Sequence, residues 1–101
     1  MLKTSFNTDY SGDMASRIEK IIPSTIENLL STSEEEIFIP HDFSRKMDNF
    51  VKLWEKFGKY GYDGLYVLFL TRKENEYKEK MLFIHLSSLE DEVISVSLEI
   101  Y

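Results

Sequence analysis

The sequence predicts an α+β domain in which a C-terminal antiparallel meander of three strands packs against helices. The first observation is a two-residue alternation in 93–101, where apolar side chains occupy every second position. The second is the enrichment of 65–71 and 78–86 in Val, Ile, Leu, Phe and Tyr. The third is an apolar stripe at spacings of three and four over 43–57, which is typical of an amphipathic helix.

Length and composition predict one self-sufficient domain. The chain has 101 residues, a hydrophobic fraction of 43%, no cysteine and a net charge of −6. A chain of this size buries roughly 65% of its unfolded surface, which is enough for a single core. There is no apolar run of membrane-spanning length and no signal-peptide pattern near the N-terminus, so we expect a cytoplasmic protein without a membrane partner.

The N-terminal third predicts an edge strand followed by helix. Residues 2–6 alternate weakly, and Ser11 is a candidate N-cap for a helical region over 13–30. Pro23 interrupts that region, and an interior proline costs roughly 3 kcal/mol. We therefore expect two short helices meeting at Pro23, with one kinked helix as the alternative because the apolar face stays in phase.

The middle of the chain predicts a short strand and the long helix. Residues 37–39 form a brief apolar run that Pro40 stops, which suits a possible fourth strand near 36–39. The helix over 43–57 then begins after Asp42 as N-cap and ends at Gly58, where we expect the left-handed conformation of a helix C-cap.

The three C-terminal strands differ in the faces that they bury. Both alternate sets of 65–71 and 78–86 are apolar, so we expect these strands inside the sheet with both faces covered. The strand over 93–101 has a single apolar face, which predicts an edge strand. A free edge there could accept a strand from another chain.

The residue types do not assemble into a catalytic, cofactor or metal site. His41 and Asp42 are adjacent as in some metal hydrolases, but His85 is the only other histidine and lies in a predicted strand. There is no nucleophile-elbow serine, no glycine-rich phosphate loop and no cysteine nucleophile. We therefore expect a protein that is not an enzyme and that needs no cofactor.

Tyrosines and acidic residues are the candidates for partner contact. Tyrosine is favoured at interfaces because it offers a rigid ring with a polar tip. An acidic triplet in a turn is suited to recognising a basic protein surface. The predicted partner-binding residues are Tyr60, Tyr62, Glu90, Asp91, Glu92 and Tyr101.

These observations favour a small acidic, non-catalytic module that occupies the surface of a partner protein. Immunity proteins, antitoxins and phage-encoded inhibitors of host enzymes are of this class. One alternative is an oligomeric subunit, such as a homodimer, that pairs through the C-terminal edge strand. Another is a nucleic-acid-binding module using the basic residues of 45–59, which the net charge of −6 disfavours.

Overall fold

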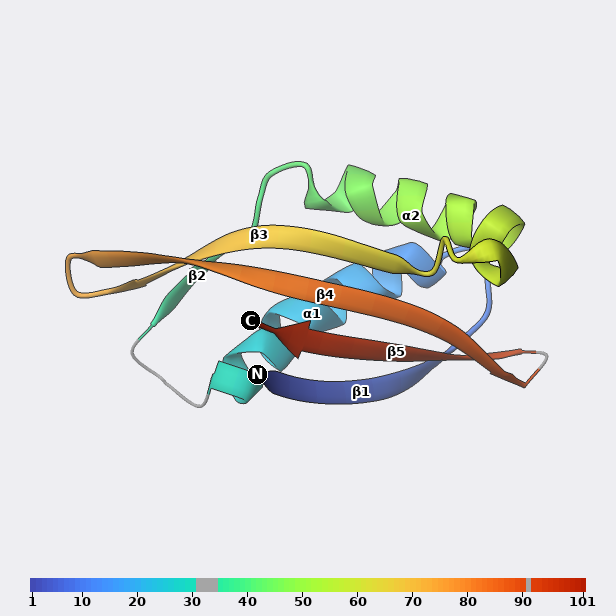
Figure 1. Ribbon diagram of the computed structural model, residues 1–101, viewed down its shortest axis with the longest axis horizontal. Helices are drawn as coiled ribbons and strands as arrows, with labels where there is room; N and C mark the ends of the chain where they lie inside the picture. The colour runs from blue at the N-terminus through green and yellow to red at the C-terminus, as the bar shows by residue number, and fades with distance from the viewer. Residues whose placement is uncertain (31–34, 91) are drawn as a thin grey trace.

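The computed structural model describes residues 1–30, 35–90 and 92–101, and it shows a mixed α+β fold (Figure 1). A five-stranded antiparallel sheet has the order β1-β5-β4-β3-β2, with helices α1 and α2 packed on the same face. In chain order the elements are β1 Leu2–Asp9, α1 Met14–Leu30, β2 Glu36–Phe38, α2 Phe43–Phe57, the 3-10 helix η1 Gly58–Tyr60, β3 Gly64–Lys73, β4 Glu76–Glu90 and β5 Val93–Ile100.

The predicted meander of three strands is present as β3, β4 and β5, and two further strands, at the positions of the possible fourth strand near 36–39 and of the weak strand over 2–6, extend the sheet to five. The strands run further than predicted because the β3–β4 hairpin turns through Glu74 and Asn75 alone. Glu74 adopts a positive φ of 57°, the left-handed conformation that tight hairpin turns require. β2 contributes three residues beside β3, and β1 is the strand predicted over 2–6, extended to Asp9.

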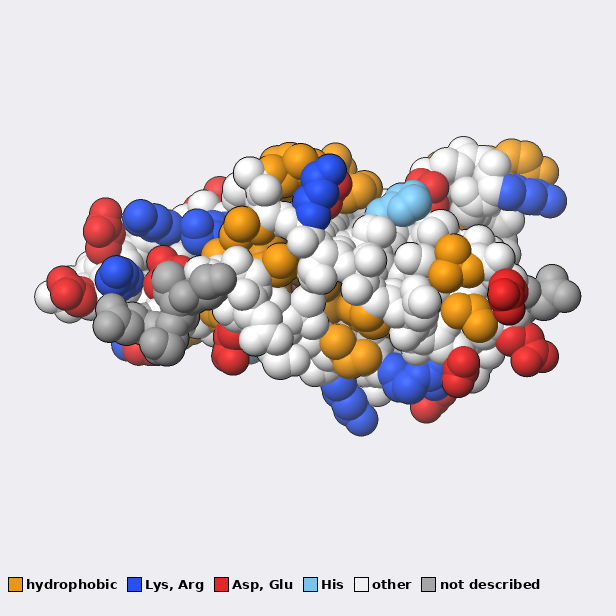
Figure 2. Space-filling model, turned by 90° about the horizontal axis from the view of Figure 1, so that it is seen from below, with side chains coloured by type: hydrophobic (Ala, Val, Ile, Leu, Met, Phe, Trp, Pro, Cys, Tyr) orange, Lys and Arg blue, Asp and Glu red, His pale blue; other side chains and the backbone are white. Residues whose placement is uncertain are grey.

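β5 is not an edge strand, so that prediction is wrong. It lies between β4 and β1, with Leu2 opposite Ile100 and Asp9 opposite Val93. β1 thus returns along the whole of β5 and covers the edge that would have been free. The open edges of the described sheet belong to β1 and β2, and β1 lies on the side of the molecule that Figure 2 faces.

The core lies between the helices and the inner face of the sheet. α1 contributes Ile18, Ile22 and Ile26, none of which is exposed to solvent. Each such side chain stabilises the fold by roughly 1.5–3 kcal/mol when fully buried. The other core side chains are Met14, Ala15, Phe43, Met47, Phe50, Val51, Val67, Phe69, Leu82, Ile84, Leu86, Ile94, Val96, Leu98 and Ile100.

α1 is one helix, so the prediction of two short helices at Pro23 is wrong. Pro23 is exposed, and the buried face on either side of it stays in register. The hydroxyls of Ser24 and Thr25 donate to the Ile21 carbonyl at 3.0 and 2.9 Å. Continuous packing of the isoleucine face outweighs the cost of the proline.

Both predicted ends of α2 differ in detail, although its bounds are as predicted. Asp42 makes no side-chain capping hydrogen bond and instead pairs with Arg45 and Lys46 at 3.4 and 3.7 Å. Gly58 is right-handed at φ −56° because the chain continues into η1, and the left-handed residue is Gly61 at φ 100°.

Gly58 is required for space rather than for backbone conformation. A Cβ atom there would lie 2.6 Å from Cδ1 of Trp54, well inside van der Waals contact. The indole therefore packs directly over the glycine, at the point where α2 gives way to η1.

The outer face of the sheet is open to solvent, so the prediction that β3 and β4 are covered on both faces is wrong. α1 and α2 share the opposite face, and among the described residues no element lies over the outer one. Apolar side chains of β3 and β4 on that face are consequently exposed.

Candidate protein-interaction surface

The outer side of β2, β3 and β4 carries a cluster of exposed apolar side chains. Tyr66 is 59% exposed and Leu68 is 49% exposed, and three neighbours are similarly open. The outer-face patch, as it is called below, comprises Phe38, Tyr66, Leu68, Leu70 and Tyr77, with the half-buried Met81 and Phe83. A contiguous apolar area on a monomer surface marks an interaction site more often than isolated exposed residues do.

Strand register brings these side chains together. Directly opposite residues of antiparallel strands point to the same face. Tyr66 lies opposite Phe83, and Leu68 lies opposite Met81. Leu70 lies between Glu79 of β4 and Phe38 of β2.

At one end of the patch the rings form a continuous surface. The Tyr66 and Phe83 ring centroids are 4.6 Å apart, with the planes tilted by 36°. The Phe83 ring also covers Gly64, since a Cβ atom there would lie 2.6 Å from Phe83 Cε1. A larger residue at position 64 would displace this ring, so the glycine helps to set its position.

At the other end Arg72 holds two rings in place. Its guanidinium carbon is 5.8 Å from the centroids of both Phe38 and Tyr77, a distance typical of cation–π contact. It donates to the Tyr77 hydroxyl at 3.3 Å and pairs with Glu36. The hydrogen bonds to Glu36 and Tyr77 raise the pKa of Arg72.

The β5–β1 half of the outer face is polar. Serine side chains of β5 occupy it, and Lys3 pairs with Glu99 at 3.5 Å. Tyr101 donates to the Glu99 carboxylate at 2.7 Å, which lowers the pKa of Glu99 and raises that of Tyr101. The apolar patch therefore has a polar border on this side.

Two shallow hollows flank the patch along β3. One, of about 290 Å³, lies between α2 and β3 and is lined by Leu53, Tyr62 and Tyr66. The other, also about 290 Å³, is lined by Phe38, Pro40 and Leu68. Exposed apolar surface thus continues past the sheet edge onto α2, where Leu53 is 45% exposed.

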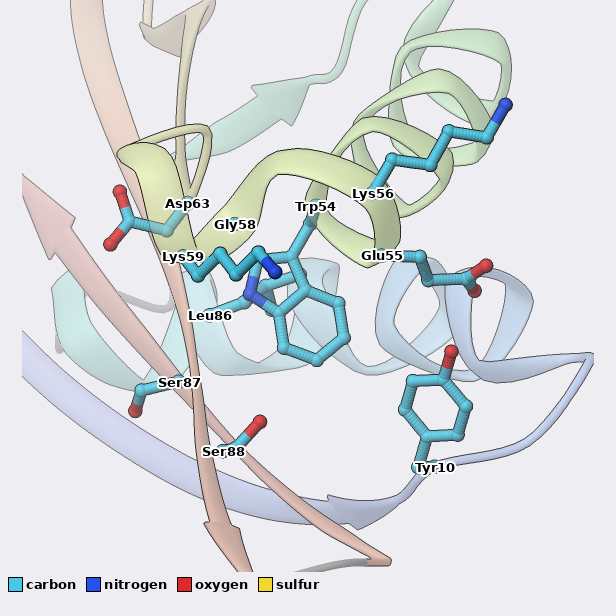
Figure 3. A pocket seen from close by; sticks show the side chains of 10 residues that line it. All are labelled: Tyr10, Trp54, Glu55, Lys56, Gly58, Lys59, Asp63, Leu86, Ser87 and Ser88. Carbon is cyan, nitrogen blue, oxygen red and sulfur yellow. The ribbon is translucent and has the colours of Figure 1, made fainter.

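A larger and more polar pocket of about 540 Å³ lies between the end of α2 and β4 (Figure 3). The Trp54 indole points into it, and its centroid is 5.9 Å from that of Tyr10. Burial, followed by the charge and hydrogen bond of Glu55, raises the pKa of the Tyr10 hydroxyl. Lys59 and Ser88 also line the pocket.

The Asp63 side chain is turned away from the middle of this pocket. The Asp63 carboxylate points away from Trp54 and instead contacts His85 Nε2 at 3.0 Å. The two serines that line the pocket, Ser87 and Ser88, lie near the C-terminal end of β4. Within the described ranges, no group of three or more His, Cys, Asp or Glu side chains is arranged to hold a metal ion.

The predicted contact residues that the structure describes fall into three places. Tyr62 lines the hollow next to Tyr66, and Tyr101 extends from β5 beside Met81, so both border the outer-face patch. Tyr60, which is 72% exposed, lies on η1. Glu90 and Glu92 are exposed at the β4–β5 turn, and Asp91 lies outside the described residues.

Sequence reasoning largely missed the patch, because none of its residues is among the predicted partner-binding residues. The signal was present in β3, where both alternate sets are apolar. Because α1 and α2 both pack on the inner face, no described element is left to cover the outer one, and the second set is exposed.

Comparison of the chain with known proteins finds no matching family model, no matching curated protein and no matching solved structure. No helix in the part of the chain that the structure describes has the length and apolar character needed to cross a membrane.

Proposed function

We propose that the chain is a non-catalytic protein-binding module that acts by occupying a partner protein's surface through the outer-face patch. The observation that carries this proposal is the uncovered apolar face of β3 and β4. Exposing such a face to water is unfavourable, and a partner that covers the face removes this cost. An inhibitor, immunity protein or antitoxin acting in the cytoplasm, as in a phage-infected cell, works in this way.

Charge indicates what the partner presents. The two bases on the outer face, Lys3 and Arg72, are each paired with a carboxylate of this chain. Glu79 lies beside Leu70 on the same face, and the whole chain carries a net charge of −6. The complementary partner is a protein with an apolar centre and a rim of Lys and Arg, which also speeds association.

The composition of the patch supports recognition by anchoring rings. Interfaces derive most of their affinity from a few aromatic and Arg side chains that are desolvated together. Tyr66, Tyr77 and Arg72 are of these types, and their neighbours on the sheet already fix them. Little side-chain entropy is then lost on binding.

The basic side of α2 does not favour the nucleic-acid alternative. Arg45 and Lys46 both pair with Asp42 of this chain. Asp42 offsets part of this positive charge and the whole chain carries a net charge of −6, and both weaken the attraction to phosphate.

Binding by matched variants tests the proposal. A partner captured from cells of the source organism is purified, and its affinity for the wild type, Leu68→Asp and Ser95→Asp is measured by calorimetry. Leu68 is in the patch, whereas Ser95 lies on the polar half of the same face. We expect Leu68→Asp to weaken binding by at least about 100-fold and Ser95→Asp by less than about 3-fold. Equal affinity of all three proteins would remove the patch from the contact.

A further inference from the structure

β1 presents an open edge that the proposed function does not use. One side of β1 pairs with β5 along Leu2–Asp9, and none of the described strands pairs with the other side. The Tyr10 N–H donates to the Glu92 carbonyl at 2.9 Å, which continues the same register. The direction of the backbone groups alternates along a strand. The N–H and C=O groups of even-numbered residues therefore point toward β5, whereas those of Lys3, Ser5 and Asn7 point away from the sheet edge into solvent.

A groove follows this edge on the helix side. It has a volume of about 380 Å³ and lies between β1 and α1, lined by Phe6, Ile21 and Leu29 among others. Ile21 is 38% exposed there. In the view onto β1, hydrophobic side chains show through the middle and charged ones lie mainly around the margins (Figure 2).

Arg17 closes one end of the edge. Its guanidinium donates to the Asp9 carbonyl and, at 3.2 Å, to the Thr8 hydroxyl. The stretch open to pairing is therefore 3–7, with three outward-pointing residues.

We propose that β1 pairs antiparallel with β1 of a second copy of this chain, about a two-fold axis at Ser5. An outward-pointing residue can bond only to another outward-pointing residue, so the axis must pass through a residue and not between two. An axis at Ser5 pairs Lys3 with Asn7 of the second copy and Ser5 with its counterpart. This arrangement uses all three outward residues and leaves the Arg17 contact to Asp9 intact.

The charges of β1 favour a second copy over an unrelated strand. Lys3 lies at one end and Asp9 at the other, both on the outer face of the sheet. In the antiparallel pair each Lys3 is diagonal to Asp9 of the second copy. Its ammonium, which contacts Glu99 of its own chain at 3.5 Å, can therefore also approach the Asp9 carboxylate of the other copy. The two-fold also places the Ile21 side of each groove toward that of the other copy, where apolar surface can be covered.

The dimer joins two sheets into one and keeps both outer-face patches on the same side. A two-fold axis perpendicular to the sheet preserves the faces of both copies, so the patches remain free. A dimer of this kind could engage a two-fold symmetric or repetitive partner with an avidity that one copy lacks.

Sedimentation of matched variants tests the pairing. The Ser5 N–H points outward, so Ser5→Pro removes no hydrogen bond within the subunit, and proline is tolerated at such edge positions. Over roughly 1–300 µM we expect the wild type and Ser5→Ala to dimerise, and Ser5→Pro to raise the dissociation constant at least about 10-fold. A wild type that stays monomeric, or a Ser5→Pro protein that dimerises equally well, would overturn the proposal.

Cysteine cross-linking tests the register, because the chain has no cysteine of its own. Ser5→Cys would place two thiols opposite each other with Cα atoms about 5.5 Å apart, within disulfide range. Asn7→Cys would place them about 13 Å apart along the strands, too far to bond. We expect rapid oxidation of Ser5→Cys to a covalent dimer and little of Asn7→Cys. Equal cross-linking of the two, or none in Ser5→Cys, would contradict this register.

Discussion

The ring centroids of Tyr66 and Phe83 lie 4.6 Å apart on the face of the sheet that neither helix covers. Both residues belong to strands that look like interior strands in sequence. Their inner neighbours, Val67 and Leu82, are 1% exposed and fill the core. The same pair of strands therefore serves stability on one side and presents apolar surface to solvent on the other.

The two faces should respond differently to truncation. We expect Leu82→Ala to lower the free energy of unfolding by about 2–5 kcal/mol, because it opens a cavity in the core. Leu68→Ala should cost less than about 1 kcal/mol, because half of that side chain is already in water. Urea unfolding monitored by circular dichroism gives both values. Equal losses would show that something covers the outer face.

Gly58 and Trp54 provide a test of close packing. A Cβ atom at position 58 would lie 2.6 Å from the indole, so Gly58→Ala must displace the ring. We expect a loss of about 1–3 kcal/mol and a shift in tryptophan fluorescence, as the chain has a single tryptophan. Gly12→Ala is the matched control, because nothing lies within 4 Å of the added atom. Similar losses in both variants would contradict the packing argument.

Pro23 offers a stabilising substitution. It is exposed inside a continuous helix and cannot donate a backbone hydrogen bond. We expect Pro23→Ala to raise the free energy of unfolding by about 1–3 kcal/mol in thermal or urea unfolding. Ser24→Ala, at the next exposed position, should gain less than about 0.5 kcal/mol. A destabilised Pro23→Ala protein would indicate that the proline sets a bend that the core requires.

Asp13 links stability to acid pH. Hydrogen bonds from Ser11 and then Arg17 lower its pKa below the usual 3.8. As the pH falls, Asp13 is therefore protonated in the unfolded state before it is protonated in the folded state. Its contribution to the free energy of unfolding is present above the unfolded-state pKa and is lost as the pH falls through the lower, folded-state pKa. Asp13→Asn should be less stable than the wild type at neutral pH, with the difference shrinking on acidification. A difference that stays constant between about pH 6 and pH 2 would contradict this.

Local signals predicted local structure well. The spacing from Phe43 to Phe57 predicted the bounds of α2 because helix period and flanking turn residues are encoded within the element itself. The strand near 36–39 and the hairpin of β3 and β4 were predicted for the same reason. Helix ends were less predictable: Asp42 prefers Arg45 and Lys46 to the backbone, which depends on side-chain geometry.

Non-local pairing was beyond the reach of the pattern. The single apolar face of β5 is compatible with an edge strand or with a central strand whose other face meets solvent. Its position depends on β1, which is more than 80 residues earlier in the chain. The pattern also did not show which face of β3 the helices leave uncovered. Tyr62 and Tyr101 were therefore predicted as contact residues, whereas Leu68 and Leu70 were expected to be covered.

The pairing of β1 with β5 also has a consequence for biosynthesis. While the ribosome has not yet released residues 93–100, a nascent chain holds β1 and β4 without the neighbour that joins them. The sheet is complete only when β1 and β5, which are far apart in the sequence, have paired. Such non-local pairing means a high contact order, and we expect folding to be slow relative to helical proteins of this length. Until β5 has emerged, the apolar faces of β1 and β4 stay exposed, so we expect the need for chaperones to be greatest before that point.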